Sequence, residues 1–444
     1  MKILYTFMGH KRQDIKPVRP EIDASVFQAI TCAVDMFKFE EPLLPNLREI
    51  SCEDIEGDTL WNMYPFLCSR LQRFWMHIHQ PPGPATMTIL SALGAKSPRI
   101  AEFIIHGSWS YNGQLMPHIS LSLCRFSHLR SVCCAEVTLT HRAIFHLASL
   151  PNLCEIDIRV SDDQIGICPS LHTPFPALRS LSLNGESITA SIDFVQKLIR
   201  SASLKSFNIC VNDCPTSAQL GQIITLLVAH SLPEYLKDIN FSHPDYISYG
   251  DHSPPLLDPA DLAFLMKFPN LECISLETEC SIVGFDDNLL EAMAMSWPKL
   301  HHLRLTNGLG NSLPSRCTLH GMLLLVQHCP NLMTLRIVFQ SSAEIGWNGR
   351  PGGGIVNEHV HELEVGESPI SDPRAVASFL SDIFPNLTSI MAWDNFDPDD
   401  VMQVQNRERW QEAIELFHSF VAIRKEERAW AAAAGRNEQE MKVD

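Results

Sequence analysis

The sequence predicts an α/β solenoid, in which short parallel strands stack along one face and helices cover the other. Three observations lead to this fold class: a nine-residue phrase that returns seven times, alternation of apolar and polar residues within it, and helical patterns between the copies. The clearest copies read FPNLECISL at 268–276, LPNLCEIDI at 150–158 and FPNLTSIMA at 384–392. A phrase repeated at near-constant spacing is the sequence signature of a repeat architecture.

Weaker copies extend the pattern to thirteen units, aligned on their first apolar residue. The units begin at Leu47, Leu71, Ile100, Leu129, Leu153, Leu178, Leu204, Leu236, Leu271, Leu300, Leu332, Val360 and Leu387. The intervals average about 28 residues, within the range typical of leucine-rich repeats. The fourth position is apolar in every unit, and the third is polar in twelve of the thirteen.

Alternation over five or six residues is typical of a strand with one buried face. Parallel neighbours cannot be joined by a tight turn and need a crossover, usually a helix. Helical patterns occupy these crossovers at 58–67, 191–202, 217–230, 258–268, 287–297, 319–329 and 372–384. The proline of the repeated phrase is expected to end each helix and direct the chain into the next strand. We therefore expect strands on a concave face and helices on a convex face.

Four segments are expected along the chain: an N-terminal segment with a lead-in helix at 1–40, the repeats at 41–397, a helix at 398–433 and a disordered tail at 434–444. The helix carries an apolar face, formed by Trp410, Ile414, Phe417, Val421 and either Ile423 or Trp430. Because the last strand of a solenoid exposes an edge, we interpret this helix as a cap. A helix that binds a partner is the alternative.

The units match the L-x-x-L-x-L pattern of leucine-rich repeats, but the Asn or Cys usual three residues after the sixth position is mostly replaced, for example by Glu186 and Glu279. Irregular repeats with such phrases resemble the repeat half of fungal F-box/leucine-rich-repeat proteins, over about residues 20–395. The resemblance implies the substrate-recognition subunit of a cullin-type (SCF) ubiquitin ligase, with a protein substrate and a ligase adaptor as partners. Only 46 residues precede Leu47, and they contain no recognisable F-box, so adaptor binding is expected only with an F-box upstream.

Composition excludes several classes of partner from our expectations. The chain has 34 basic and 51 acidic residues, a formal net charge of −17, so we expect no nucleic acid. Its 14 cysteines include no Cys-x-x-Cys pair and lie within apolar phrases, as free thiols in a reducing compartment do. Its aliphatic runs are shorter than a membrane span. We predict a monomeric intracellular protein, cytoplasmic or nuclear, with no membrane partner.

No motif combines the groups that catalysis requires. The run GRPGGG at 349–354 lacks the Lys-Ser/Thr of a phosphate loop. His359 and His361 share one side of an extended segment, as metal ligands do, but they are better explained as solvent-facing strand residues. Nucleophile and zinc-protease signatures are absent from the sequence. We therefore predict a non-enzymatic protein without a metal or a cofactor.

The expected binding surface is the concave face, to which the third, fifth and seventh positions of each unit project. Large or charged side chains at these positions are Arg73, Trp75, His77, Ile104, His106, His302, Arg304, Arg336, Glu362 and Glu364. We predict that Trp75 and Ile104 bind a protein partner, because such side chains offer a large area with few rotatable bonds. Arg304 and Arg336 are expected to steer that partner. The alternative is that Trp75 packs against the N-terminal segment 20–40.

Two insertions, 242–259 and 341–358, are longer than turns require. Loops held by a rigid scaffold often carry recognition residues, and Tyr246, Tyr249 and Trp347 are the candidates in these insertions. Surface loops without a partner are the alternative.

Three functions are open on the sequence alone. The first is the ligase substrate-recognition subunit, which would act by holding a substrate close to the ligase without covalent chemistry. The second is a free-standing leucine-rich-repeat protein that binds or masks a protein partner. The third, of a different class, is a GTPase-activating or other enzyme activity that uses a rim arginine, Arg304.

Overall fold

The computed structural model describes residues 2–3, 42–53, 59–78, 81–108, 110, 112–162, 173–200, 203–213, 215–242, 256–277, 281–305, 315–341, 350–393 and 397–440. The chain groups into two compact units. Unit 1 comprises Met1–Asp213 with Ala229–Tyr235, and unit 2 comprises Cys214–Val228 with Leu236–Asp444. A solenoid can divide in this way because each repeat contacts only its neighbours. The predicted bounds of the solenoid, 41–397, stay a prediction.

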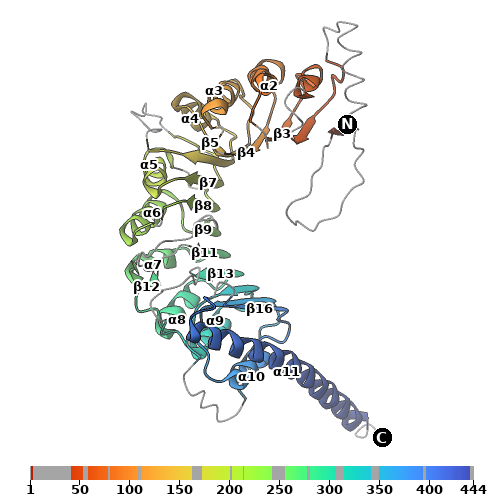
Figure 1. Ribbon diagram of the computed structural model, residues 1–444, viewed down its shortest axis with the longest axis vertical. Helices are drawn as coiled ribbons and strands as arrows, with labels where there is room; N and C mark the ends of the chain where they lie inside the picture. Colours follow the sequence, from red (N-terminus) through yellow and green to blue (C-terminus); the bar gives the residue numbers. More distant parts are fainter. Residues whose placement is uncertain are drawn as a thin grey trace. The chain divides into compact units, whose positions relative to one another are not determined.

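Unit 1 is a parallel sheet with helices on one side (Figure 1). Its strands are β1 (Lys2–Ile3), β2 (Glu49–Glu53), β3 (Arg73–Ile78), β4 (Glu102–Gly107), β5 (Ser131–Thr138), β6 (Glu155–Val160), β7 (Ser180–Gly185) and β8 (Ser206–Val211), paired in chain order. Its helices are η1 (Thr59–Phe66), α2 (Pro84–Lys96), α3 (Asn112–Leu123), α4 (His141–Ser149) and α5 (Ile188–Leu198).

Unit 2 repeats the same arrangement. Its main sheet contains β9 (Asp238–Ser242), β11 (Cys273–Glu277), β13 (His302–Leu305), β14 (Thr334–Arg336), β15 (Glu362–Gly366) and β16 (Ser389–Ala392), and a separate pair joins β10 (Leu256–Leu257) to β12 (Ser281–Ile282). Its helices are α6 (Ser217–His230), whose last residues belong to unit 1, α7 (Pro259–Ala263), η3 (Leu265–Lys267), α8 (Asp287–Ser296), α9 (Leu319–His328), α10 (Pro373–Ile383) and α11 (Val401–Glu440).

The strands confirm the predicted fold class, an α/β leucine-rich-repeat solenoid. Within the described residues, each of the thirteen predicted repeats contains a strand that begins two residues after its first apolar position. The first is β2, in the repeat of Leu47, and the last is β16, in the repeat of Leu387. The helices were predicted less completely. The helices α2, α3 and α4 were missed, and the predicted helix at 258–268 is broken into α7 and η3.

The repeated phrase links each helix to the next strand, as predicted. Leu150, Phe268, Trp297, Cys329 and Phe384 are the C-cap residues of α4, η3, α8, α9 and α10. Each is buried and is followed by proline. The residue before proline avoids the α-helical conformation, so the chain leaves the helix at a buried side chain that also fills the core.

One backbone contact recurs where the strands begin. The carbonyl oxygen of Arg48, at the second repeat position, accepts the N–H groups of Gln72 at 2.8 Å and Arg73 at 3.0 Å in the next repeat. The same pair of bonds is accepted by Gln72, Ala101, Arg130, Cys154, Arg179, Lys237, Glu272, His301 and His361. These bonds fix the register, so residues at the same repeat position lie side by side on neighbouring strands.

The ends of the strands have no such common contact. Asn112 Oδ1 accepts from the N–H and the hydroxyl of Thr138, both at 2.9 Å. The Asp287 carboxylate accepts from the N–H and the hydroxyl of Thr318, both at 2.7 Å. Different side chains, Asn112 and Asp287, therefore make these two contacts.

The last repeats are covered by α11, which packs on α10 (Figure 1). Trp410 of α11 is buried, its indole N–H donates to Ser368 O at 2.8 Å, and its ring meets that of Phe339 at 6.0 Å between centroids. Trp393 Nε1 donates to the same Ser368 oxygen at 3.1 Å. The helix thus joins the end of the sheet through two tryptophans that share one acceptor.

Two expectations for this helix need correction. The buried face is formed by Asn406, Trp410, Ala413 and Phe417, whereas Ile423 and Trp430 are exposed. The helix also continues to Glu440 instead of ending at 433, so it includes much of the tail that was predicted to be disordered. The alanine-rich sequence around 429–434 favours helix strongly, and one glycine at 435 costs only about 1 kcal/mol.

The run GRPGGG has a structural role in the part that is described. Asp382, a fully buried carboxylate at the end of α10, accepts from Gly352 N at 2.9 Å and from Arg350 Nε at 2.8 Å. A Cβ atom on Gly352 would lie 2.6 Å from the side chain of Ile383. Arg424 of α11 approaches Asp382 from the other side, with Nη1 at 3.5 Å from Oδ1. The glycines therefore let the backbone reach a buried carboxylate.

We expect Trp410→Ala to lower the free energy of unfolding by about 3–5 kcal/mol, because it empties a buried site and leaves Phe339 without its ring partner. Urea denaturation followed by circular dichroism measures this change. Trp430→Ala is the matched control, since Trp430 lies on the same helix but is exposed. Equal losses for both variants would show that α11 does not pack as described.

Candidate functional site

The sheet face opposite the helices, called the open face, carries the predicted binding residues of unit 1. Strand register places Trp75 on β3 beside Ile104 on β4, Ile104 beside Cys133 on β5, and Cys133 beside Asp157 on β6. All four side chains are partly exposed, while their neighbours along each strand face the buried core. This row of four side chains is therefore aromatic and apolar at Trp75 and Ile104 and acidic at Asp157.

Three aromatic rings form the centre of this face. The ring centroids of Trp75 and His77 lie 6.1 Å apart, those of Trp75 and His106 lie 6.2 Å apart, and those of His77 and His106 lie 6.0 Å apart. Within the part of the chain that is described, the indole N–H of Trp75 has no acceptor. This group, called the aromatic triad, offers a flat apolar area with an available hydrogen-bond donor.

Beside the aromatic triad, β5 departs from regular pairing. Its register to β6 jumps between Cys134 and Thr138, so residues 135–137 bulge from the sheet. Bulges often re-aim a side chain near functional sites. The bulge contains Glu136, whose Oε1 lies 4.0 Å from Nδ1 of His106. The Glu136 carboxylate raises the pKa of His106 above its usual 6.5, while partial burial of the imidazole opposes this effect.

The acidic end of the row is held by neutral donors. Asp157 accepts from Asn184 Nδ2 at 2.7 Å and from Cys133 Sγ at 3.5 Å. Burial raises the pKa of Asp157, and these hydrogen bonds oppose the increase. Burial and the nearby carboxylate of Asp157 raise the pKa of the Cys133 thiol to about 12. Cys133 is therefore a poor nucleophile at neutral pH, because the thiolate is the reactive form.

The charged residues predicted in unit 2 do lie together, but they pair with one another. Arg304 Nη1 lies 3.1 Å from Glu277 Oε1, and Arg336 Nη2 lies 2.8 Å from Glu364 Oε1, with Arg336 Nη1 3.7 Å from Glu277 Oε2. Glu277, at the seventh position of its repeat, was not among the residues predicted from the sequence. Both arginines are paired with these carboxylates, and their steering of a partner stays a prediction.

The remaining predicted strand residues lie outside these ion pairs. His302 Nδ1 lies 2.7 Å from the Thr334 hydroxyl on the neighbouring strand. Glu362, the last predicted residue of this face, is adjacent in register to Thr334 and is partly exposed. Arg73, at the start of β3 in unit 1, pairs with Glu102 at 2.9 Å.

Several predicted residues lie outside the described part of the chain. These are the loop candidates Tyr246, Tyr249 and Trp347, and the N-terminal segment 20–40 that was the alternative neighbour of Trp75. Loop recognition and packing of Trp75 against that segment stay as predictions.

The described residues include no group of three or more His, Cys, Asp or Glu side chains that could hold a metal ion. His359 and His361 lie two residues apart, and Nδ1 of His361 is 3.2 Å from the carbonyl oxygen of His359. Within the same described ranges, no helix combines the length and apolar character that crossing a bilayer requires.

Comparison with known proteins gave no family model and no curated protein that matches the chain. Two solved structures resemble it weakly. A plant peptide hormone receptor, RGFR1 in complex with RGF2, has 12% sequence identity and a TM-score of 0.33 over 78% of this chain. The leucine-rich repeat-containing protein LegL7 from Legionella pneumophila has 13% identity and a TM-score of 0.26, over 84% of this chain and 91% of its own length. The chain spans 59% of the length of the receptor.

We expect Glu136→Gln to lower the pKa of His106, because it removes the carboxylate that raises this pKa and leaves the opposing effect of burial. The raised pKa adds stability that is fully present below pH 6.5 and is lost as the pH rises through the folded-state pKa, so the variant should lack this pH dependence. NMR titration of the imidazole carbons measures the shift. Glu155→Gln, on the neighbouring strand β6, is the control, and an unchanged His106 pKa in Glu136→Gln would contradict the pairing.

Proposed function

We propose that this chain is a protein-recognition scaffold that binds a protein partner through the open face of unit 1. The observation that carries the proposal is the aromatic triad of Trp75, His77 and His106, partly exposed on adjacent strands beside Ile104. Trp75 lies on the face that lacks helices, while its neighbours Phe74 and Met76 fill the core.

The energetics of interfaces favour this reading. Binding energy usually concentrates in a few aromatic or arginine side chains that are rigid and become fully desolvated. Trp75 satisfies the first requirement, because its strand is paired on both sides and its ring contacts two imidazoles. Its indole N–H, which has no acceptor among the described residues, gives a partner a directional contact as well.

The charged groups next to the aromatic triad indicate which side chains a partner would present. Glu136 and Asp157 place two carboxylates on the same face, one beside His106 and one beside Cys133. A partner segment with an apolar side chain followed by a lysine or arginine would match the aromatic triad and then the two carboxylates. The partner we propose is therefore a protein segment with a basic residue next to an apolar one.

The finer role that we propose is substrate recognition for a cullin-type ubiquitin ligase. Its support is the resemblance of the repeats to F-box/leucine-rich-repeat proteins, and in this role the chain would act by proximity. A free-standing protein that masks its partner would use the same face. Binding of purified ligase adaptor to the chain distinguishes the two roles, because only the first requires that contact.

Trp75→Ala should weaken partner binding by about 2 kcal/mol or more, roughly thirtyfold, while the melting temperature changes little. The proteins captured by the immobilised chain from a cell extract are quantified by mass spectrometry for the wild type and the variants. Trp430→Ala, which removes an exposed tryptophan of unit 2, is the control and should leave the captured set unchanged.

Two results would refute this site. One is a captured set that Trp75→Ala leaves intact. The other is a fall in melting temperature as large as that of a core substitution, which would show that Trp75 packs within the chain and stabilises the fold.

A further inference from the structure

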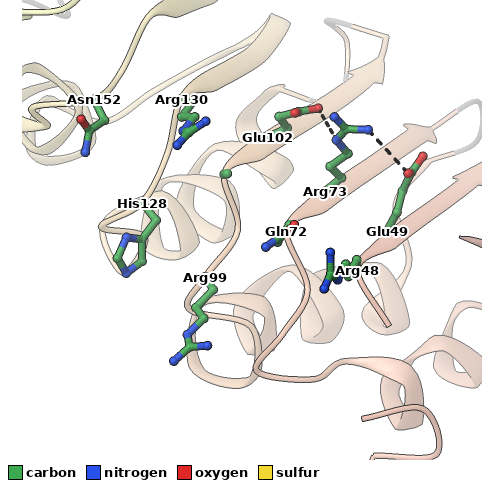
Figure 2. A pocket seen from close by; sticks show the side chains of 10 residues that line it. Arg48, Glu49, Gln72, Arg73, Arg99, Glu102, His128, Arg130 and Asn152 are labelled. Atoms are coloured by element: carbon green, nitrogen blue, oxygen red, sulfur yellow. Dashed lines mark ion pairs between the residues drawn. The ribbon is translucent and has the colours of Figure 1, made fainter. Parts of the chain in front are cut away.

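A pocket at the edge of unit 1 gathers cationic side chains. It lies where the chain enters the first strands of the sheet and has a volume of about 840 Å³ (Figure 2). The charged residues that line it are Arg48, Arg73, Arg99 and Arg130, with Glu49 and Glu102. Four arginines against two glutamates give this lining a net charge of +2, in a chain whose formal net charge is −17. The pocket, called the edge pocket, is thus opposite in sign to the chain as a whole.

The two glutamates are already engaged by one arginine. Arg73 lies 2.9 Å from Glu102 and 3.8 Å from Glu49, as the dashed lines in Figure 2 show. The other arginines, Arg48, Arg99 and Arg130, are exposed and form no ion pair with any described residue. Three guanidinium groups therefore line the edge pocket without an ion-pair partner among the described residues.

The backbone beneath these side chains is rigid. Arg48, Gln72, Ala101 and Arg130 occupy the second position of four successive repeats, and each of their carbonyl oxygens accepts two N–H groups from the next strand. Neighbouring strands lie roughly 4.8 Å apart, so Arg48 and Arg130 start roughly 14 Å apart on opposite sides of the pocket. Ala101, with its short side chain, lines the pocket between them, and Arg99 on the preceding turn lines the same pocket (Figure 2).

We propose that the edge pocket binds a phosphate monoester, held by Arg48, Arg99 and Arg130. A phosphate monoester carries a charge of about −1.5 to −2 at pH 7 and three strong acceptor oxygens. Each arginine offers paired N–H donors that fit such oxygens. One carboxylate would balance only one of the three cations, whereas a phosphate dianion balances two and can bond to all three.

Neutral polar groups complete the site. Gln72, His128 and Asn152 line the same pocket and can donate to the remaining oxygens or to the group that carries the phosphate. The volume exceeds that of a phosphate ion, so the pocket has room for a phosphate attached to a larger body. Its two possible sources are a phosphorylated side chain of a protein and a small soluble phosphate ester.

The charge of the chain favours a phosphate monoester over a nucleic acid. A nucleic-acid backbone is a long row of single charges, and binding it requires a cationic surface of similar length. The uncompensated arginines are instead gathered around one pocket of an acidic protein. The three arginines proposed to hold the phosphate, Arg48, Arg99 and Arg130, are not among the residues of the proposed partner site, so the proposal holds or fails independently of the proposed function.

The experiment uses the full chain at about 0.15 M salt and three probes. The probes are free O-phosphoserine, a fluorescent glycine-serine peptide with one phosphoserine alongside its unphosphorylated form, and a single-stranded oligothymidylate. Binding of O-phosphoserine is followed by ³¹P NMR, and binding of the others by fluorescence anisotropy. The test variant is the double substitution Arg48→Gln with Arg130→Gln. Arg179→Gln is the matched control, because Arg179 is an exposed arginine at the same repeat position outside the edge pocket.

We expect at least one phosphoserine probe to bind the wild type, and the double variant to weaken it on the order of tenfold or more. Arg179→Gln should bind it normally. Binding of the peptide alone assigns the phosphate to a protein, binding of O-phosphoserine alone assigns it to a small ester, and binding of both supports the site through their shared group.

Two outcomes overturn the proposal. The first is that no phosphoserine probe binds, or that the double variant binds it as well as the wild type does. The second is that the oligothymidylate binds and that Arg179→Gln weakens all probes as much as the double variant does. That second outcome would indicate a general attraction of polyanions to surface cations. Circular dichroism of each variant confirms that the fold is retained.

Discussion

The paired backbone hydrogen bonds at the starts of most strands are the contact on which the rest of the repeat structure depends. One carbonyl oxygen accepts two N–H groups of the next repeat, so the register is set without any side chain. The second repeat position can therefore carry residues as different as Arg48 and Ala101. The same constraint aligns the fifth positions, which brings Trp75 beside Ile104 on the open face. The same backbone contact therefore aligns the residues of both the edge pocket and the open face. The side chains at these positions then determine the chemistry of each surface.

The sequence was sufficient to predict the strands because their signal is local. A half-buried strand requires alternation, and a buried residue before proline requires the chain to leave its helix, as at Trp297 and Phe384. The helices α2 and α3 were harder to predict. Pro117 lies inside α3, where proline normally argues against a helix. Pro84 stands at the start of α2, where proline is tolerated. Packing against neighbouring repeats outweighs the local preference of Pro117.

The candidate site was predictable only where it follows strand alternation. Trp75, His77 and His106 were assigned to one face because their positions in two strands have the same parity, and the rings do meet. Glu136 was missed because it lies in a bulge, where alternation no longer gives the direction of a side chain. The edge pocket was missed for another reason: its arginines come from separate repeats, and each alone resembles an ordinary surface residue.

Hydroxyl-radical footprinting of Trp75 tests the central claim most directly, because it reads the exposure of that ring in the intact chain. The chain is labelled alone and with its captured partner, and oxidation of each tryptophan is quantified by mass spectrometry. Our account predicts that the partner protects Trp75 and leaves the exposed Trp430 reactive. Equal oxidation of Trp75 with and without the partner would contradict it, since the partner would then bind elsewhere.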